Sequence, residues 1–347
     1  MTARLYIRPI GRLEPSTPAA ALEVAGRVDL LFAAAELIER SSGAVRRRFV
    51  TAGELLHSGD EAVAQALQRL QQPRGPIADL ALDRPCVMGV VNVTPDSFSD
   101  GGRYLAAEAA ISHGVQLETE GADILDIGGE STRPGSDPID REEECRRVLP
   151  VIEGLAKRVR VPLSVDTRNA EVMRRAAQAG ARIINDVSAL THDPQSLDVA
   201  AATGLPVVLM HAQGDPRTMQ RNPTYDDVVL EVYDALESRV DACERAGIPR
   251  ERLVVDPGIG FGKTLAHNLA LLGSLTIFHG LGCAVLLGTS RKSFIGKLTG
   301  DRAEDDRLPG TIATSVLALE RGARVFRVHD VAPVADALKV AAATVAP

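Results

Sequence analysis

The feature that most constrains the fold of this chain is a repeated alternation of short apolar runs with longer amphipathic segments after residue 76. Each run ends in or near a polar residue, and a loop and a helix-like segment follow it. Short runs that are apolar on both faces are typical of parallel strands covered by helices. The eight runs are Cys86–Val93, Ile124–Gly128, Leu163–Asp166, Ile183–Asp186, Val207–Met210, Leu253–Asp256, Val285–Leu287 and Val325–Val328.

The segments between these runs carry apolar residues at helical spacing and are predicted to be helices. The clearest are Leu105–Glu118, Ala170–Ala179, Tyr225–Ala246 and Gly310–Arg321. The units repeat at intervals of roughly 34 residues, which suits a (β/α)8 TIM barrel of about 250 residues. An open doubly wound sheet is the alternative. Eight consecutive units without a break in composition favour the closed barrel.

Residues 1–75 are predicted to form an α-rich N-terminal extension in front of a barrel over residues 76–347. The division rests on the polar, Pro- and Gly-bearing stretch Gln72–Pro76, which is typical of a linker. The predicted elements of the extension are a brief strand at Leu5–Ile7 and helices over Ala19–Arg40 and Asp60–Leu70. The extension holds no cluster of chemically active residues, so its function is unknown and we expect a packing or interface module.

Composition excludes several classes of function. The chain of 347 residues has a formal charge of −7 and 3% aromatic residues, which argues against a nucleic-acid coat or a base-stacking platform. No apolar run approaches the ~18 residues that a membrane span needs, and no signal peptide is visible. Four widely separated cysteines suggest neither a zinc site nor a disulfide framework. We therefore expect a soluble, cytoplasmic protein.

Polar residues gather where the predicted strands end, which is where a TIM barrel carries its chemistry. The residues at these ends are Asn92, Gly129–Arg133, Asp166, Asn185, Met210–His211, Asp256, Ser290–Lys292 and Arg327–His329. Each alone has another explanation, because an Asp after a strand is often the N-cap of the next helix. Eight together at one rim predict an active site.

The sequence partly matches two nucleotide-binding motifs but lacks a required glycine in each. In Gly258–Thr264 the phosphate-loop spacing requires glycine where Pro257 stands, and the dinucleotide fingerprint requires glycine where Lys263 stands. A nucleotide hydrolase or a nicotinamide enzyme is therefore disfavoured, and these glycines are expected to let the backbone approach a flat ligand. The polar loops Thr94–Gly102 and Ser131–Ser136 are expected to close over substrate.

Several of these segments resemble the dihydropteroate synthase family of pterin-binding TIM barrels. Asn92–Gly102 and Asp126–Gly135 resemble its two signature segments, and the other matches follow in the family's order to the end of the chain. The other matches are Ser164–Thr167, Ile184–Val187, Asp256–Lys263, Ser290–Phe294 and Arg327–Asp330. The resemblance starts near residue 76 and does not extend to the first 75 residues.

The resemblance implies a folate-pathway transferase that joins (7,8-dihydropterin-6-yl)methyl diphosphate to 4-aminobenzoate. The products are 7,8-dihydropteroate and diphosphate, with Mg²⁺ as the cofactor. The family also implies inhibition by sulfonamides, which imitate 4-aminobenzoate, and a homodimer.

The resemblance and the chemistry of the substrates assign roles to the rim residues. The pterin is expected to bind Asp166, Asn185, Met210, Asp256, Phe261 and Lys292. Asp256 is the candidate carboxylate for two pterin N–H groups, because a carboxylate accepts paired donors in a fork. Lys292 supplies a cation for the ring carbonyl or N5, while Met210 and Phe261 offer apolar contacts to the ring faces.

The diphosphate is expected to bind Asn92, Arg327 and His329. Arg327 and His329 lie one residue apart and point to the same side of their strand, at a place where barrels commonly bind phosphate. Asn92 offers an uncharged oxygen to Mg²⁺ and is the candidate metal ligand.

The remaining assignments concern aminobenzoate and catalysis. Thr132, Arg133 and Ser293 are expected to line the aminobenzoate pocket. Because the dihydropterin delocalises a cation at its exocyclic carbon, departure of diphosphate is expected to run ahead of attack by the weak amine nucleophile. The expected catalytic residues are Asp166 and Asp96, which stabilise the transient cation, and Lys292.

Two other functions stay open at this point. A pterin-binding barrel of the methyltransferase type shares the Asp and Asn pterin contacts, but is not expected to keep the Arg327–His329 pair or the Ser131–Arg133 segment. A catalytically silent paralogue predicts the loss of rim residues, and none is missing.

Overall fold

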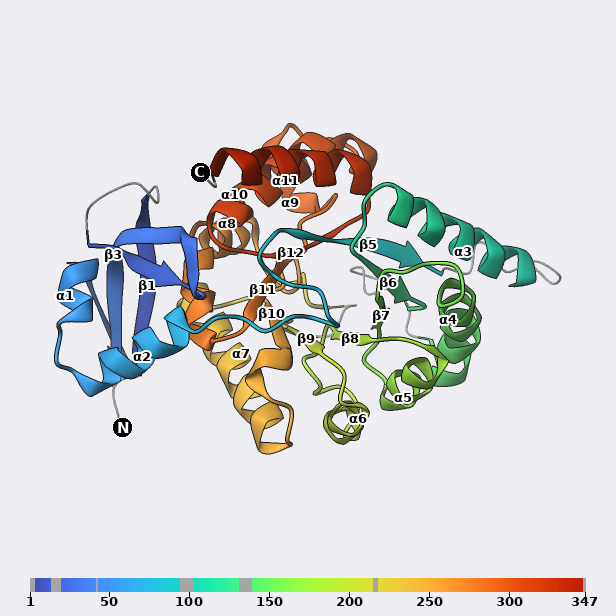
Figure 1. Cartoon of the computed structure of the whole chain (residues 1–347), viewed down its shortest axis with the longest axis horizontal. Helices are drawn as coiled ribbons and strands as arrows, with labels where there is room; N and C mark the ends of the chain where they lie inside the picture. Colours follow the sequence, from blue (N-terminus) through green and yellow to red (C-terminus); the bar gives the residue numbers. More distant parts are fainter. Residues whose placement is uncertain are drawn as a thin grey trace.

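The structure is a computed structural model that describes residues 4–13, 20–41, 43–93, 103–130, 139–214 and 218–345. Its larger part is a closed barrel of eight parallel strands in the order β10-β11-β12-β5-β6-β7-β8-β9 (Figure 1). The predicted TIM barrel is confirmed, and the open doubly wound sheet is excluded because β9 pairs with β10 and closes the ring.

All eight barrel strands occur where the apolar runs predict them, within one residue at each end. They are β5 Cys86–Asn92, β6 Ile124–Gly128, β7 Leu163–Asp166, β8 Ile183–Asp186, β9 Val207–Met210, β10 Leu253–Asp256, β11 Ala284–Leu287 and β12 Val325–Val328. Four-residue strands are sufficient here because each is hydrogen-bonded on both sides and covered by helices.

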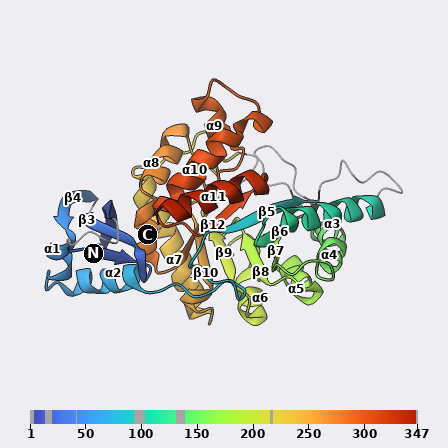
Figure 2. The same cartoon turned by 45° about the horizontal axis from the view of Figure 1, so that its top comes forward.

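Helices surround the barrel, as Figure 2 shows. They are α3 Arg103–Thr119, α4 Arg141–Leu155, α5 Ala170–Ala179, α6 Ser196–Thr203, α7 Val228–Arg245, α8 Leu265–Gly273, α9 Ser293–Leu298, α10 Leu308–Glu320 and α11 Val331–Val345, with 3₁₀ turns η2 Arg250–Arg252, η3 Leu275–Leu281 and η4 Glu304–Arg307. The four predicted helices are confirmed. None of the described helices is long and apolar enough to cross a lipid bilayer.

The barrel interior changes from apolar to polar along the strands. Near the amino ends, inward positions such as Ile124, Ile183 and Val325 form one apolar cluster. Ile77 and Leu82 join this cluster and close that end of the barrel. Because side chains alternate along a strand, the next inward residue lies two positions later. That step places Asp126, Asn185, Asp256 and Arg327 inside the barrel towards the carboxyl ends.

The N-terminal extension is a four-stranded antiparallel sheet with two helices, and the prediction that it is α-rich is wrong. Its elements are β1 Arg4–Leu13, β2 Leu22–Val24, β3 Arg27–Ser41, β4 Ala44–Thr51, α1 Ala52–Leu56 and α2 Glu61–Gln71. The predicted strand at Leu5–Ile7 and the helix at Asp60–Leu70 are confirmed. The predicted helix over Ala19–Arg40 is replaced by β2 and β3.

Burial on both faces of β3 explains this error. Leu37 packs against the helices of the extension, whereas Ile38 belongs to the core of the barrel. A strand that is buried on both sides loses the strict alternation that identifies strands. Its Ala, Leu and Glu content also has high helix propensity. Pairing with β1 on one edge and with β2 and β4 on the other overrides that local preference.

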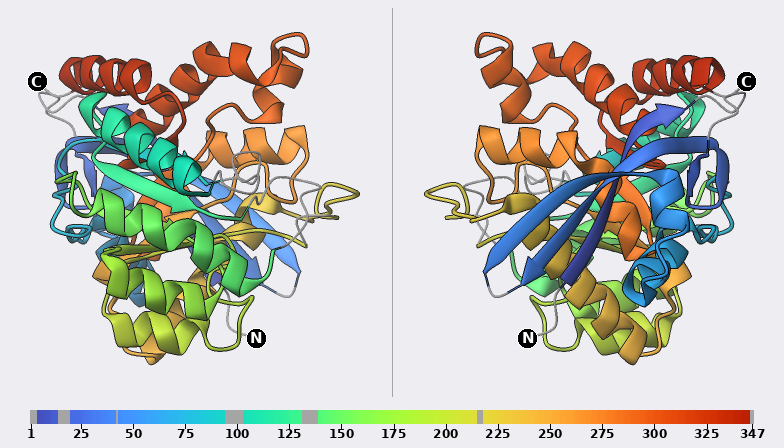
Figure 3. Two further views of the ribbon diagram at one scale, coloured as in Figure 1. Left: turned by 90° about the vertical axis from the view of Figure 1, so that its right-hand side faces the viewer. Right: turned by 90° about the vertical axis from the view of Figure 1, so that its left-hand side faces the viewer.

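The sheet of the extension lies against α7 and η3 of the barrel, as seen in Figures 1 and 3. The ring of Tyr6 meets that of Tyr233 edge-on, with 5.2 Å between centroids. Asp234 accepts a hydrogen bond from the Tyr6 hydroxyl at 2.8 Å and forms ion pairs with Arg4 and Arg40. Apolar contacts and complementary charges therefore attach the extension to the barrel.

Candidate active site

A narrow cavity of about 60 Å³ lies at the carboxyl ends of the barrel strands. Its lining contains all six residues predicted to hold a pterin, together with both residues predicted to clamp diphosphate. The lining residues are Asp166, Asn185, Val187, Met210, Asp256, Phe261, Gly288, Ser290, Lys292, Arg327 and His329. Side chains from six strands and their following loops thus meet at the predicted rim.

Five other predicted residues are not part of this lining. Asn92 is the exposed last residue of β5, and Ser293 is the exposed first residue of α9. Asp96, Thr132 and Arg133 lie outside the described residues. The roles given to these five stay predictions.

Arg327 lies at the centre of a buried polar network. Its Nε donates to Oδ2 of Asp126 at 2.6 Å, and its Nη2 donates to Oδ2 of Asp166 at 2.7 Å. The side-chain amide of Asn185 donates to the same Asp126 oxygen at 3.0 Å. These bonds hold the guanidinium in one orientation across the barrel interior.

Burial and charge act in opposite directions on this network. Burial raises the pKa of Asp166, and the nearby Asp126 adds to the increase, while Arg327 opposes it. Burial also works against the charge of Arg327, yet the two carboxylates raise its pKa above the ordinary value. The guanidinium therefore remains charged, and its pairing offsets the cost of burying the two carboxylates.

Asp256 and Lys292 face the same cavity from neighbouring strands. Oδ1 of Asp256 accepts the backbone N–H of Gly258 at 2.7 Å, and burial raises the pKa of this carboxyl while Lys292 opposes the increase. The Nζ of Lys292 donates to the carbonyl of Ile259 and lies 4.7 Å from the ring centroid of Phe261. Burial lowers the pKa of Lys292 to about 8. A carboxylate and an ammonium thus border the space where a flat, polar-edged ring would lie.

Gly258 provides the close approach that this arrangement needs. Its φ is +67°, and a Cβ there would lie 1.9 Å from the carbonyl oxygen of His211. No other residue type fits this position without moving the backbone. The glycine-rich segment after β10 is therefore a tight turn over the cavity and not a phosphate loop.

The structure adds three side chains whose roles were not predicted. Asp126 is fully buried and binds Arg327. Oγ of Ser290 accepts the backbone N–H of His329 at 3.1 Å and lies 3.0 Å from its Nδ1. Lys263 is 3% exposed, and its Nζ lies 3.0 Å from Nδ1 of His211. A signal existed for Asp126, because it is a charged residue on the inward side of a predicted strand.

Lys263 and His211 form a partly buried contact beneath the glycine-rich turn. Nζ of Lys263 also donates to the carbonyl of Phe261 at 3.0 Å. Burial lowers the pKa of Lys263 to about 7 and that of His211 to about 3, and the lysine adds to the effect on the imidazole. His211 is therefore a neutral acceptor that holds the lysine, and the lysine holds the turn containing Phe261.

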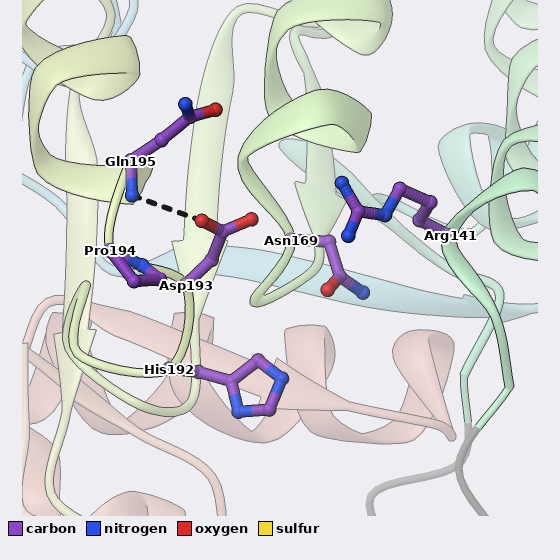
Figure 4. A pocket seen from close by; sticks show the side chains of 6 residues that line it. All are labelled: Arg141, Asn169, His192, Asp193, Pro194 and Gln195. Atoms are coloured by element: carbon purple, nitrogen blue, oxygen red, sulfur yellow. Dashed lines mark hydrogen bonds between the residues drawn. The ribbon is translucent and has the colours of Figure 1, made fainter.

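A larger, more open cavity of about 430 Å³ lies between the loop before α5 and the loop before α6. Figure 4 shows its lining residues Arg141, Asn169, His192, Asp193, Pro194 and Gln195. The carboxylate of Asp193 accepts the backbone N–H groups of Ala170 at 3.1 Å and Gln195 at 2.9 Å. This carboxylate therefore serves as a helix cap, and the narrow cavity is the better candidate for chemistry.

Comparisons with known proteins agree with this assignment. The profile of the family described as pterin binding enzyme matches residues 88–329. A dihydropteroate synthase of Escherichia coli strain K12 is 49% identical over 265 residues, which cover 76% of this chain and 93% of that protein.

Solved structures give the same result. The Xanthomonas albilineans dihydropteroate synthase with 4-aminobenzoic acid is 54% identical, with a TM-score of 0.72 over 76% of this chain and 94% of that one. The same enzyme in complex with 7,8-dihydropteroate is 51% identical, with a TM-score of 0.70 over 78% of this chain and 98% of that one.

Proposed function

This chain belongs to the dihydropteroate synthase family of pterin-binding enzymes, and from this premise we propose that its reaction takes place in the narrow cavity at the carboxyl ends of the barrel strands. The reaction joins (7,8-dihydropterin-6-yl)methyl diphosphate to 4-aminobenzoate and yields 7,8-dihydropteroate and diphosphate. The observation that carries the proposal is the convergence of Asp166, Asn185, Asp256 and Lys292 on one buried space.

The polar edge of a dihydropterin matches this set of side chains. Asp256, 5% exposed, accepts N–H groups of the ring, and Asn185 offers both a donor and an acceptor. Lys292 donates to the ring carbonyl or N5. Met210 and Phe261 contact the ring faces, and Phe261 also borders the ammonium of Lys292. Buried polar groups discriminate strongly, because a ligand that leaves them unpaired loses their hydrogen bonds.

The diphosphate is proposed to bind beside Arg327 and His329. The two carboxylates use two of the five N–H groups of Arg327, which leaves Nη1 directed to neither. The partial exposure of its side chain, 25%, gives a ligand access to the guanidinium. The positive charge is locally balanced by Asp126 and Asp166, so orientation contributes more here than net charge.

Mg²⁺ fits this site only as an ion shared with the substrate. The described residues contain no group of three or more His, Cys, Asp or Glu side chains placed to hold a metal. Asn92, exposed at the end of β5, would offer one hard amide oxygen to the ion, and the substrate would have to supply further oxygen ligands. When bound, the ion neutralises charge on the leaving diphosphate.

The chemical step follows from these positions. The C–O bond of the pterinylmethyl diphosphate breaks, the electron pair leaves with diphosphate, and the aryl-amine nitrogen forms the new C–N bond and loses a proton to solvent. Arg327 and His329 stabilise the departing anion. Asp166, together with Asp96 from the first loop, stabilises positive charge on the dihydropterin, while Thr132, Arg133 and Ser293 orient the aminobenzoate.

The decisive experiment measures diphosphate release by the purified chain, with and without 4-aminobenzoate and Mg²⁺. Aminobenzoate-dependent release supports the synthase. A methyltransferase-type barrel gives no such release, and a silent paralogue binds a diphosphate-bearing pterin without turning it over. Titration with that pterin separates a silent binder from inactive material. A sulfonamide is expected to compete with 4-aminobenzoate, and ultracentrifugation tests the predicted homodimer.

A further inference from the structure

A second feature lies at the opposite end of the barrel and has no part in the proposed reaction. It is a cavity of about 360 Å³ between the N-terminal extension and the amino ends of β11 and β12. The turn between β2 and β3, the linker after α2 and the loop before β12 form its walls. We call it the junction cavity.

Three arginines from three separate segments line the junction cavity. Arg27 begins β3, Arg74 lies in the linker, and Arg324 precedes β12. Each retains a buried nitrogen without a hydrogen-bond partner, namely Nη1 of Arg27, Nε of Arg74 and Nε of Arg324. Arg324 is only 7% exposed. These nitrogens are enclosed by protein and do not open onto the cavity. The three guanidinium groups nevertheless give its wall a concentration of positive charge, which suits an anionic ligand.

The carboxylates near the cavity do not balance these arginines. Asp29 accepts from Nε of Arg27 at 3.0 Å and lies 3.4 Å from Nη2 of Arg324. Asp83 is exposed at the edge of the cavity. Among the described lining residues and their ion-pair partners, three guanidinium groups face two carboxylates.

The remaining titratable groups do not change this excess of positive charge. Burial lowers the pKa of Arg74 to about 10, so it stays charged at neutral pH. Nε2 of His279 donates to the carbonyl of Arg321 at 2.9 Å, and burial lowers the pKa of this imidazole to about 3. His279 is thus neutral, and the cavity favours an anion.

The walls of the cavity are closely fitted. Gly322 has a φ of +91°, and a Cβ there would lie 2.4 Å from Nε2 of His279 and 2.7 Å from Cδ2 of Leu30. Gly26 has a φ of +67°, and a Cβ there would lie 2.6 Å from Cγ of Pro73. The two glycines therefore leave no room for a side chain, and at Gly322 the side chain of Leu30 from the extension packs directly against the barrel backbone.

We propose that the junction cavity binds a phosphorylated small molecule. A phosphate group presents oxygens in three directions, which suits three arginines from three segments better than a planar carboxylate does. The apolar side chains of Pro76, Leu82 and Val285 line the same cavity and contact the remainder of the ligand. Such a ligand bridges the extension and the barrel, and its binding stabilises their association by mass action.

Phenyl phosphate is the probe for this proposal, titrated calorimetrically into the full-length chain at constant ionic strength. Ala81 lines the cavity and is exposed. Ala81→Glu introduces a competing carboxylate, and Ala81→Gln is its matched neutral control. We expect saturable binding by the wild type and the Gln variant, and binding at least tenfold weaker in the Glu variant. Equal affinity in the wild type and both variants, or no saturable binding by the wild type, overturns the proposal.

Crystals of the wild-type chain grown with tungstate provide an independent test that needs no variant. We expect an anomalous peak between the guanidinium groups of Arg27, Arg74 and Arg324. Tungstate found only at the carboxyl ends of the strands overturns the proposal. Benzoate in the same titration is expected to bind more weakly than phenyl phosphate, and equal binding would contradict the assignment to phosphate.

Discussion

Arg324 and Arg327 lie three residues apart, yet they serve opposite ends of the barrel in different ways. Arg327 is held between Asp126 and Asp166 by two short hydrogen bonds. Arg324 meets one carboxylate at 3.4 Å and keeps an unpaired Nε. At the carboxyl ends the protein itself neutralises its partly exposed cation and thereby fixes its direction. At the amino ends the cation is only partly neutralised, so positive charge remains beside the junction cavity.

The largest effect is expected from Arg327→Met. This change leaves the carboxylates of Asp126 and Asp166 buried without their counter-charge, which costs about 3–5 kcal/mol of folding free energy. Denaturant unfolding of the wild type and the variant measures this loss of folding free energy. Arg324→Met is the matched comparison and is expected to cost about 1 kcal/mol, because its only described ion pair is long and Asp29 keeps its closer partner Arg27. Equal losses for the two variants would remove the distinction between the two ends.

Lys292→Ala and Asp166→Ala are expected to lower turnover by about 10²–10⁴-fold while leaving the fold intact. Lys292→Ala removes the hydrogen-bond donor to the pterin edge. Asp166→Ala removes a negative charge that stabilises the transient cation, while Asp126 still pairs with Arg327. Steady-state rates and circular dichroism check the two parts of this expectation. A variant with a near-normal rate and a normal spectrum would refute the role given to that residue.

The two ends also share one property, because each holds a neutral histidine, fully buried in the case of His279 and half-buried in the case of His211. The pKa of His279 and that of His211 are both lowered to about 3, from about 6.5 in the unfolded chain. The unfolded state therefore binds more protons, and stability falls as the pH drops below about 6.5. Each histidine is expected to contribute about 2 kcal/mol of this loss between pH 6.5 and pH 5.

His279→Gln and His211→Gln separate these contributions. Each is expected to flatten the dependence of unfolding free energy on pH, measured by urea unfolding at pH 7, 6 and 5. An unchanged slope in either variant would show that the corresponding histidine is protonated in the folded state.

The smallest effect concerns the pH dependence of the reaction. Lys292 is charged below its pKa of about 8 and neutral above it. We expect kcat/KM to fall by up to tenfold per pH unit above pH 8, because the ammonium of Lys292 donates to the pterin ring. Lys292→Arg, which stays charged, is expected to be slower but to lack this alkaline decline. If kcat/KM of the Arg variant falls with the same midpoint, the decline is due to the titration of another group.

The barrel was predictable because each of its strands carries its own signal. Leu163–Asp166 and Leu253–Asp256 are apolar on both sides and end in a carboxylate, so strand and rim could be identified together. The same criterion misidentified β3, whose two buried faces belong to two different cores. Local pattern does not show which partner covers a face.

The sequence predicted which residues form the site better than it predicted which of them pair with one another. Residues at strand ends, such as Asn185 and Asp256, were identified from their position alone. Asp126 was missed as a partner of Arg327 because 201 residues separate them, and only closure of the barrel brings β12 and β6 to either side of β5. The unpaired arginine nitrogens at the junction cavity could not be predicted from the sequence either, because they depend on how the extension docks on the barrel.

Ile77 and Leu82 complete the apolar cluster at the amino ends, so in the described part of the chain the cavity inside the barrel opens only towards the carboxyl ends. Reactants that arrive at the carboxyl ends have no exit through the far end, so diphosphate and dihydropteroate leave by the route through which the substrates came. Because substrates enter and products leave by the same opening, the order of substrate binding and product release is constrained. A reactant that binds deep in the barrel must bind before a reactant that binds nearer the opening, and the deeper group is the last to be released.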